Sequence, residues 1–181
     1  PYVLRPYNFP SGTIGKGFAI LKLDDKNNIA VVNLQGRVFM DAIDCPFRSM
    51  EALLSNELKD IKIIFVDFHA ETTAEKYAFY KYFDGKISAI VGTHTHIQTN
   101  DDQLSDLGTA FISDVGMTGP YDSVIGIKKD APINRFLYQT PQYFVPAEEN
   151  FQICGVIIEI NENGKAIAIE KIFYPGLKKG V

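Results

Sequence analysis

The sequence has little of several residue types, and each scarcity narrows the kind of protein it can be. Only two cysteines occur among 181 residues. Cys45 and Cys154 lie far apart without metal-like spacing, which favours free thiols in a reducing compartment over a disulfide framework. No apolar run is long enough to span a membrane, and the first residues do not resemble a signal peptide. We therefore expect a cytoplasmic protein with no membrane partner.

The chain also lacks an excess of positive charge. Its net charge is −4 at pH 7 and its pI is near 5.4. Non-specific nucleic-acid binding needs clustered Lys and Arg, so this charge argues against a nucleic-acid partner. The content of 46% hydrophobic and 22% charged residues is ordinary for a soluble globular protein, and we expect one domain over 1–181. The sequence does not fix the oligomeric state, and a homo-oligomer is one option.

The apolar pattern predicts an α/β fold. The strand–helix–strand order of the middle segments indicates parallel pairing, whereas the first two and the last two strands read as hairpins. Residues 72–75 fit a capping box, in which Thr72 accepts from a helical N–H and Glu75 reaches back. Strands are expected over 17–23, 29–34, 61–69, 87–93, 109–113, 153–160 and 166–172, a turn over 24–28, and helices over 47–58, 72–82 and 130–138.

Histidine is scarce too, and all three histidines follow two neighbouring strands. His69 ends one strand, and His94 and His96 end the next. Side chains alternate along a strand at about 3.3 Å per residue, so His94 and His96 should share one face roughly 6.6 Å apart. Parallel strands bring both segments to one carboxyl edge, where α/β sheets bind ligands. Because imidazole binds zinc, iron and manganese well, the pattern favours a metal site over a purely structural role.

Other polar residues near these strand ends are weaker candidates. Asp67 either orients a metal ligand or simply caps the strand. Glu71 is either an anion stabilised by the start of the following helix, which we favour, or a residue of the site. Arg37, which follows an early strand, is the best candidate for binding an anionic substrate. Three further acidic residues are expected to be hydrated and not to bind metal: Asp101, Asp102 and Asp114.

Several motifs resemble a known family. Phe68-His69 and Gly92-Thr93-His94-Thr95-His96 resemble the last two metal motifs of calcineurin-like metallophosphoesterases. The resemblance to bacterial YmdB-like phosphodiesterases is more specific and extends from Leu4 to the final hairpin. Four segments carry it in the family's order: 33–37, 67–71, 92–99 and 114–122.

This resemblance implies a metallophosphoesterase-type β-sandwich of mixed sheets with flanking helices. It further implies a binuclear site of two transition-metal ions, usually iron or manganese, with zinc also possible. His69 and His94 would bind one ion and His96 the other. The implied reaction is hydrolysis of a cyclic nucleotide, such as 2′,3′-cyclic AMP, by a metal-activated water, and it requires no protein nucleophile.

One departure from the family pattern concerns its first metal motifs. An N-terminal Asp, a Glu-Asn pair and an Asn-His pair have no counterpart here, and that last histidine would assist leaving-group protonation. We therefore assign no catalytic acid in this chain. The first residue is Pro1 and not Met. We expect the chain to be the carboxyl-terminal portion of such an enzyme, with the N-terminal part of the fold missing, and to be inactive alone.

Alternatives from other classes remain. A non-catalytic module could keep the fold and bind a nucleotide or a protein partner without hydrolysis, as the missing motifs would suggest. An amidohydrolase barrel fits less well, because the C-terminal hairpin does not suit repeating β/α units. A cupin is disfavoured by the helix between the two histidine-bearing strands.

Overall fold

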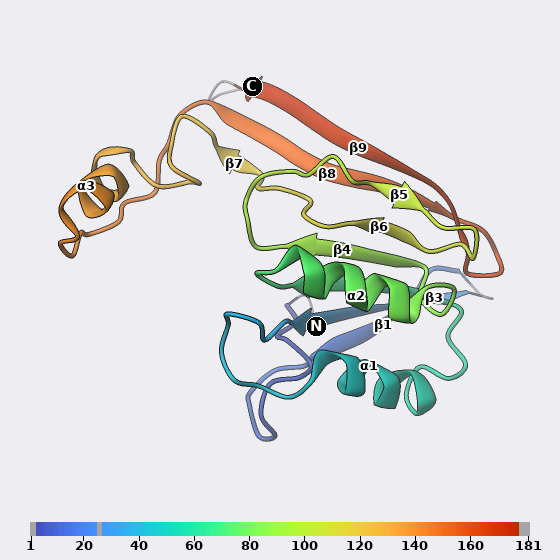
Figure 1. The fold of residues 1–181 in the computed structure, drawn as a ribbon. Helices are drawn as coiled ribbons and strands as arrows, with labels where there is room; N and C mark the ends of the chain where they lie inside the picture. Colours follow the sequence, from blue (N-terminus) through green and yellow to red (C-terminus); the bar gives the residue numbers. More distant parts are fainter. Residues whose placement is uncertain (1–2, 25–26, 178–181) are drawn as a thin grey trace.

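Two β-sheets form the framework of the protein, with helices against the larger sheet (Figure 1). The computed structural model describes residues 3–24 and 27–177, so Pro1 and two residues of the predicted turn, 25 and 26, lie outside the described residues. The strands are β1 (Phe18–Lys22), β2 (Asn28–Gln35), β3 (Ile63–His69), β4 (Ala89–Thr93), β5 (Gln103–Leu104), β6 (Ala110–Ile112), β7 (Gly119–Pro120), β8 (Phe151–Ile160) and β9 (Ala166–Leu177), and the helices are α1 (Pro46–Ser55), α2 (Thr73–Phe83) and α3 (Asp130–Tyr138).

The larger sheet is mixed, with strand order β1-β2-β3-β4-β6-β5. Strands β2, β3, β4 and β6 are parallel, while β1 and β5 pair antiparallel at the two edges. The smaller sheet has the order β7-β8-β9 and is antiparallel. Both predicted hairpins and the predicted parallel pairing of β3 with β4 are therefore confirmed.

The core has two layers, one on each face of the larger sheet. Figure 1 shows α1 and α2 on one side of this sheet and β8 and β9 on the other. Alternation along β3 serves both layers, because Phe68 packs with Phe79 of α2 whereas Phe65 packs towards Ile158 of β8. The predicted α/β sandwich with flanking helices is confirmed, although only the larger sheet is mixed and the smaller one is antiparallel throughout.

Gly92 shows why β4 needs a residue without a side chain. A Cβ at this position would lie 1.9 Å from the carbonyl oxygen of Ser113, which follows β6. We expect Gly92→Ala to lower the free energy of unfolding by about 1–3 kcal/mol, since the backbone of a packed neighbour cannot easily move. Urea denaturation would measure this loss. Gly155→Ala is a matched control, because the nearest atoms there are 3.9 Å away. Equal stability of the two variants would contradict this packing.

Several predicted boundaries were wrong in detail. Helix α1 ends at Ser55 and not at Leu58, although Pro46 sits in its first turn as expected. Strands β5 and β7 were not predicted, because two residues are too few to show an alternating pattern. Both cysteines are free, as predicted.

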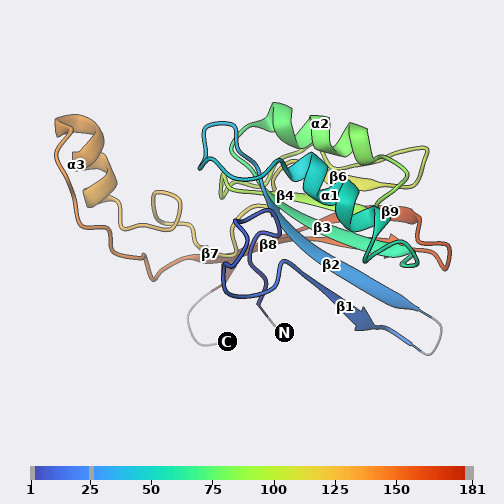
Figure 2. The same ribbon diagram turned by 90° about the horizontal axis from the view of Figure 1, so that it is seen from below.

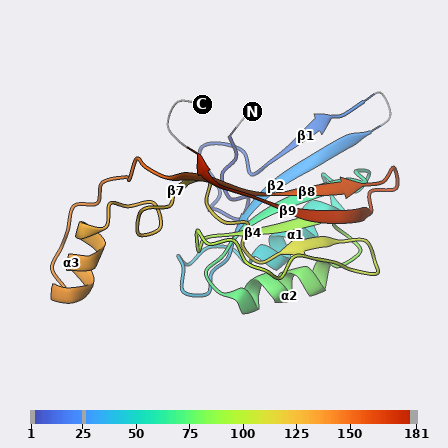
Figure 3. The same ribbon diagram turned by 90° about the horizontal axis from the view of Figure 1, so that it is seen from above.

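Helix α3 projects from the rest of the molecule on two long connections (Figure 2, Figure 3). Its side chains include Phe136, which is 75% exposed, and Tyr138, which is 67% exposed. In the described part of the chain, no helix combines the length and the apolar character that crossing a membrane requires.

Candidate metal centre

The candidate site lies where β2, β3 and β4 end side by side. In the parallel register, His69 lies between Gln35 of β2 and Thr93 of β4. His94 follows Thr93 directly, and the Gly36 N–H donates to the His69 carbonyl at 2.8 Å. The histidine segments thus meet at one carboxyl edge of the sheet, as predicted.

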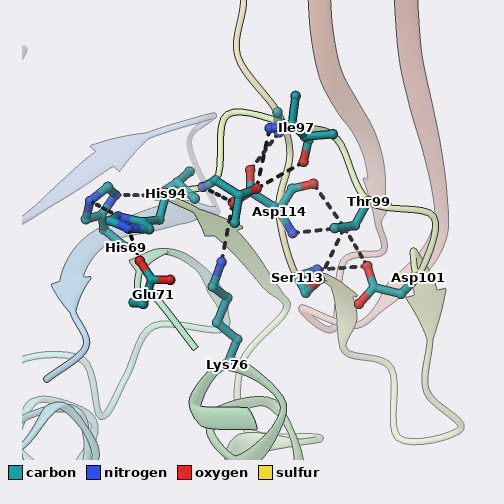
Figure 4. A network of polar contacts seen from close by, with 12 residues as sticks. His69, Glu71, Lys76, His94, Ile97, Thr99, Asp101, Ser113 and Asp114 are labelled. Atoms are coloured by element: carbon teal, nitrogen blue, oxygen red, sulfur yellow. Dashed lines mark hydrogen bonds and ion pairs between the residues drawn. The ribbon is translucent and has the colours of Figure 1, made fainter. Parts of the chain in front are cut away.

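His69 and His94 are brought into direct contact at this edge (Figure 4). The Nε2 atom of His69 lies 3.1 Å from the Nδ1 atom of His94. Their ring planes are 73° apart, with centroids separated by 4.9 Å. When two nitrogens bind the same metal ion, each at about 2.0–2.1 Å, they lie roughly 2.9–3.4 Å from each other. This range corresponds to N–metal–N angles between the octahedral and the tetrahedral value. The pair therefore fits two ligands of a single metal ion.

The far side of His69 is held by a chain of polar contacts across three strands. Its Nδ1 atom lies 3.1 Å from the Thr93 hydroxyl, which donates to Asp67 at 3.0 Å. The Asn33 amide donates to the other oxygen of Asp67 at 2.8 Å. Asp67 also lines a cleft of about 510 Å³ between the two sheets, whose wall is mostly apolar. Asp67 thus contacts Thr93 and not a histidine directly.

Glu71 lies against His94 and outside helix α2, so the favoured interpretation as a helix-start anion was wrong and the alternative, a residue of the site, agrees with the structure. Helix α2 begins at Thr73 with Thr72 as its cap, and Glu71 lies before both. Its carboxylate instead pairs with Nε2 of His94. The link between β3 and α2 is short, so Glu71 is held close to the end of β4.

The prediction that His94 and His96 share one strand face was also wrong. Strand β4 ends at Thr93, and positive φ angles of 143° at His94 and 66° at His96 turn the chain out of the sheet. His96 is exposed, and its Nδ1 atom lies 2.9 Å from the Ile125 carbonyl. Because a carbonyl only accepts, the hydrogen of His96 is on Nδ1 and its Nε2 is free to bind a ligand.

Asp114 stabilises this turn through hydrogen bonds. It was expected to be a hydrated loop residue, but it is buried. Its carboxylate accepts from the Thr95 N–H at 2.7 Å and from the Gly116 N–H at 3.0 Å. It also lies 3.4 Å from the Lys76 ammonium, and both side chains are only 2% exposed. Asp101 and Asp102 are engaged as well: Asp101 accepts from Ser113 N–H, and Asp102 pairs with Lys171.

Lys76 was missed by the sequence reasoning, although its position carried a signal. It precedes Phe79, Tyr80 and Phe83 by three, four and seven residues, which places it on the buried face of α2. A lysine on such a face needs a buried carboxylate. Asp114 supplies that carboxylate.

Glu75 fixes the loop that carries Arg37. The predicted capping box is only half present, because Thr72 accepts from the Glu75 N–H at 3.3 Å while the Glu75 carboxylate turns elsewhere. That carboxylate accepts from the N–H groups of Arg37 and Val38 at 3.1 to 3.3 Å. Arg37 follows Gln35 by two residues and is exposed at the same edge of the sheet as His69.

Burial and charge both influence His69. Burial is the largest cause that lowers the pKa of its imidazole, and electrostatic interaction with the neighbouring His94 lowers it further. A lowered pKa favours the neutral ring. The neutral ring is the form that binds a metal ion.

The donor set of the described residues is incomplete for a metal ion. Within residues 3–24 and 27–177, no group of three or more His, Cys, Asp or Glu side chains lies close enough to hold one. Catalytic zinc sites generally use three protein ligands. The pair formed by His69 and His94 therefore fits part of a metal site, and His96 lies apart from it.

The two-sheet sandwich with polar side chains gathered at its carboxyl edge defines a metallophosphoesterase-type fold. The chain belongs to the YmdB-like protein family, which matches residues 1–172. The resemblance seen in the sequence motifs is thereby confirmed.

Individual relatives agree with this membership. The chain is 47% identical over 173 residues to a 2′,3′-cyclic-nucleotide 2′-phosphodiesterase of Bacillus subtilis, covering 95% of this chain and 65% of the relative. A hypothetical protein from Thermus thermophilus has a similar structure, with a TM-score of 0.90 and 38% identity. The match covers 96% of this chain and 68% of that protein. The structure of a phosphatase from Mycoplasma pneumoniae is also similar, with a TM-score of 0.88 and 33% identity. The match covers 96% of this chain and 63% of the phosphatase. The chain thus spans about 65% of the length of the Bacillus subtilis relative.

Proposed function

We propose that this chain is part of a metal-dependent phosphodiesterase that hydrolyses cyclic nucleotides such as 2′,3′-cyclic AMP. The observation that carries the proposal is the 3.1 Å approach of His69 Nε2 to His94 Nδ1 at the carboxyl edge of the sheet. The printed activity of the Bacillus subtilis relative supports the choice of reaction and substrate.

In this proposal, the residues of this chain bind the metal ions and the substrate phosphate. His69 and His94 hold one transition-metal ion, and His96 offers Nε2 to a second, with iron, manganese or zinc as candidates. When bound, such ions supply positive charge for the phosphoryl oxygens and a water activated for hydrolysis. The exposed Arg37 would bind the phosphate anion of the substrate. Its position is fixed through its backbone by Glu75.

The compartment is part of the same proposal. Both cysteines are free thiols, Cys154 in a buried position and Cys45 in a partly buried one. Free thiols are typical of a reducing compartment. This supports a cytoplasmic site of action.

A second candidate is a binding module that holds a nucleotide without hydrolysing it. The observation that favours it is the absence, among the described residues, of any group of three metal-binding side chains. The two functions differ in turnover and not in ligand binding.

The complete gene product that contains this chain tests the proposal. After purification, we expect two transition-metal ions per chain by elemental analysis, and hydrolysis of bis(p-nitrophenyl) phosphate and 2′,3′-cyclic AMP. A chelator should abolish turnover, and added Mn²⁺ or Fe²⁺ should restore it. Undiminished turnover in metal-free protein would contradict the proposal. Nucleotide binding without any hydrolysis by the metal-loaded protein would favour the binding module.

A further inference from the structure

We propose that Glu71 and Thr93 are positioning residues, which keep a hydrogen on the outer nitrogens of His94 and His69. The inner nitrogens of both rings are thereby left facing one shared cation. This inference rests on the proposed function, because it concerns how the same metal site is prepared. Glu71 and Thr93 do not themselves bind the ion.

The Thr93 hydroxyl, which has a single hydrogen, determines where His69 carries its own. The hydroxyl hydrogen points to Asp67 at 3.0 Å, and a carboxylate oxygen can only accept it. The Thr93 oxygen must then accept from the Nδ1–H of His69, which lies 3.1 Å away. The Nε2 atom of His69 is left with a lone pair directed at His94.

Glu71 determines where His94 carries its hydrogen. The carboxylate of Glu71 faces Nε2 of His94, and two acceptors placed there would repel each other. The hydrogen of His94 therefore belongs on Nε2, and Nδ1 remains the inner nitrogen. The two rings thus use different atoms, Nε2 of His69 and Nδ1 of His94, to face the same point. Because two lone pairs 3.1 Å apart would repel each other, a metal ion, or in the metal-free protein a shared proton, must lie between them.

The sheet makes this arrangement rigid. His69 and Thr93 are register partners across β3 and β4, while Asn33 and Asp67 are register partners across β2 and β3. The contacts Asn33 to Asp67 and His69 to Thr93 are therefore cross-strand pairs, fixed by the backbone ladder. Partners of this kind, which fix ring orientation and raise ligand basicity, are usual around metal-binding histidines.

The location of the hydrogens can be measured without any metal. Long-range ¹⁵N–¹H NMR spectra of the metal-free complete gene product would report which nitrogen of each ring carries a hydrogen. We expect a hydrogen on Nδ1 of His69 and on Nε2 of His94, in addition to the proton shared between the rings. A bare Nε2 on His94 or a bare Nδ1 on His69 would overturn the inference.

Metal affinity gives the second measurement. Glu71→Ala and Thr93→Val should each weaken Mn²⁺ binding about 10–100-fold, measured by calorimetry on the complete gene product. Thr93→Ser restores the hydroxyl and should restore affinity. Glu57→Ala, at an exposed carboxylate near the end of α1, is the control and should bind as the parent does. Thermal unfolding of each variant checks that the fold persists.

The outcomes separate this inference from the proposed function. If the parent binds Mn²⁺ and Glu71→Ala and Thr93→Val bind it equally well, the positioning roles are wrong while the metal enzyme stands. If the parent binds no metal at all, the proposed function itself fails. Loss of affinity in Thr93→Val that Thr93→Ser does not rescue would also contradict the role of the hydroxyl.

Discussion

Replacing His94 with alanine is expected to reduce phosphodiesterase turnover of the complete gene product by more than about a hundredfold, since even partners behind a metal ligand are worth 10–100-fold. The change removes one of the two nitrogens that meet at 3.1 Å. The site should then lose an ion. Initial rates with bis(p-nitrophenyl) phosphate, together with metal content, would measure the effect.

The fold should survive this change, because His94 is partly exposed and lies beyond the end of β4. Cooperative thermal unfolding close to that of the parent would confirm this. Ile97→Ala, at a 54% exposed side chain three residues later, is the matched control for disturbance of the same segment. Parental turnover in His94→Ala would rule out the metal-binding role of this histidine.

The largest loss of stability is expected from Lys76→Met. The ammonium of Lys76 faces the Asp114 carboxylate inside the protein, with both side chains 2% exposed. Removing one partner leaves an uncompensated buried charge, which costs about 3–5 kcal/mol. Urea denaturation should show this as a shift of the midpoint. The Thr95 turn should loosen as well, since Asp114 also accepts from the Thr95 N–H.

A second ion pair provides the control for this effect. Lys129 lies 2.8 Å from Asp122, but more than half of each side chain is exposed. Lys129→Met should change stability far less than Lys76→Met, because water already screens the exposed pair. Combining Lys76→Met with Asp114→Asn should recover part of the loss. A Lys76→Met protein as stable as Lys129→Met would contradict the role of the buried pair.

Much of the fold could be predicted because its strands are apolar runs between turn residues. The buried stretch of β3 and the Asn-Gly turn between β8 and β9 are examples. Strands β5 and β7 escaped prediction, since they form only where a neighbouring strand offers hydrogen bonds. The projecting helix α3 was predicted as a helix, but no local pattern reports where a helix lies.

The site was predictable only in part. The order of elements brings His69 and His94 to one edge, and that inference needs nothing beyond parallel pairing. The turn at His94 and His96 depends on Asp114, which is distant in sequence and was interpreted as hydrated. Glu71 was assigned to the helix by proximity along the chain, yet its partner follows the next strand. The turn at His94 and His96 and the position of Glu71 thus both depend on contacts between segments that are separate in the sequence.

The most direct test of the account is a crystal of the complete gene product soaked with Mn²⁺ and examined by anomalous scattering. We expect a peak at about 2.1 Å, the usual length of a bond from imidazole to a metal, from both His69 Nε2 and His94 Nδ1. The outer nitrogens should still face Thr93 and Glu71. A peak bound through the outer nitrogens, or no peak between the two rings, would contradict it.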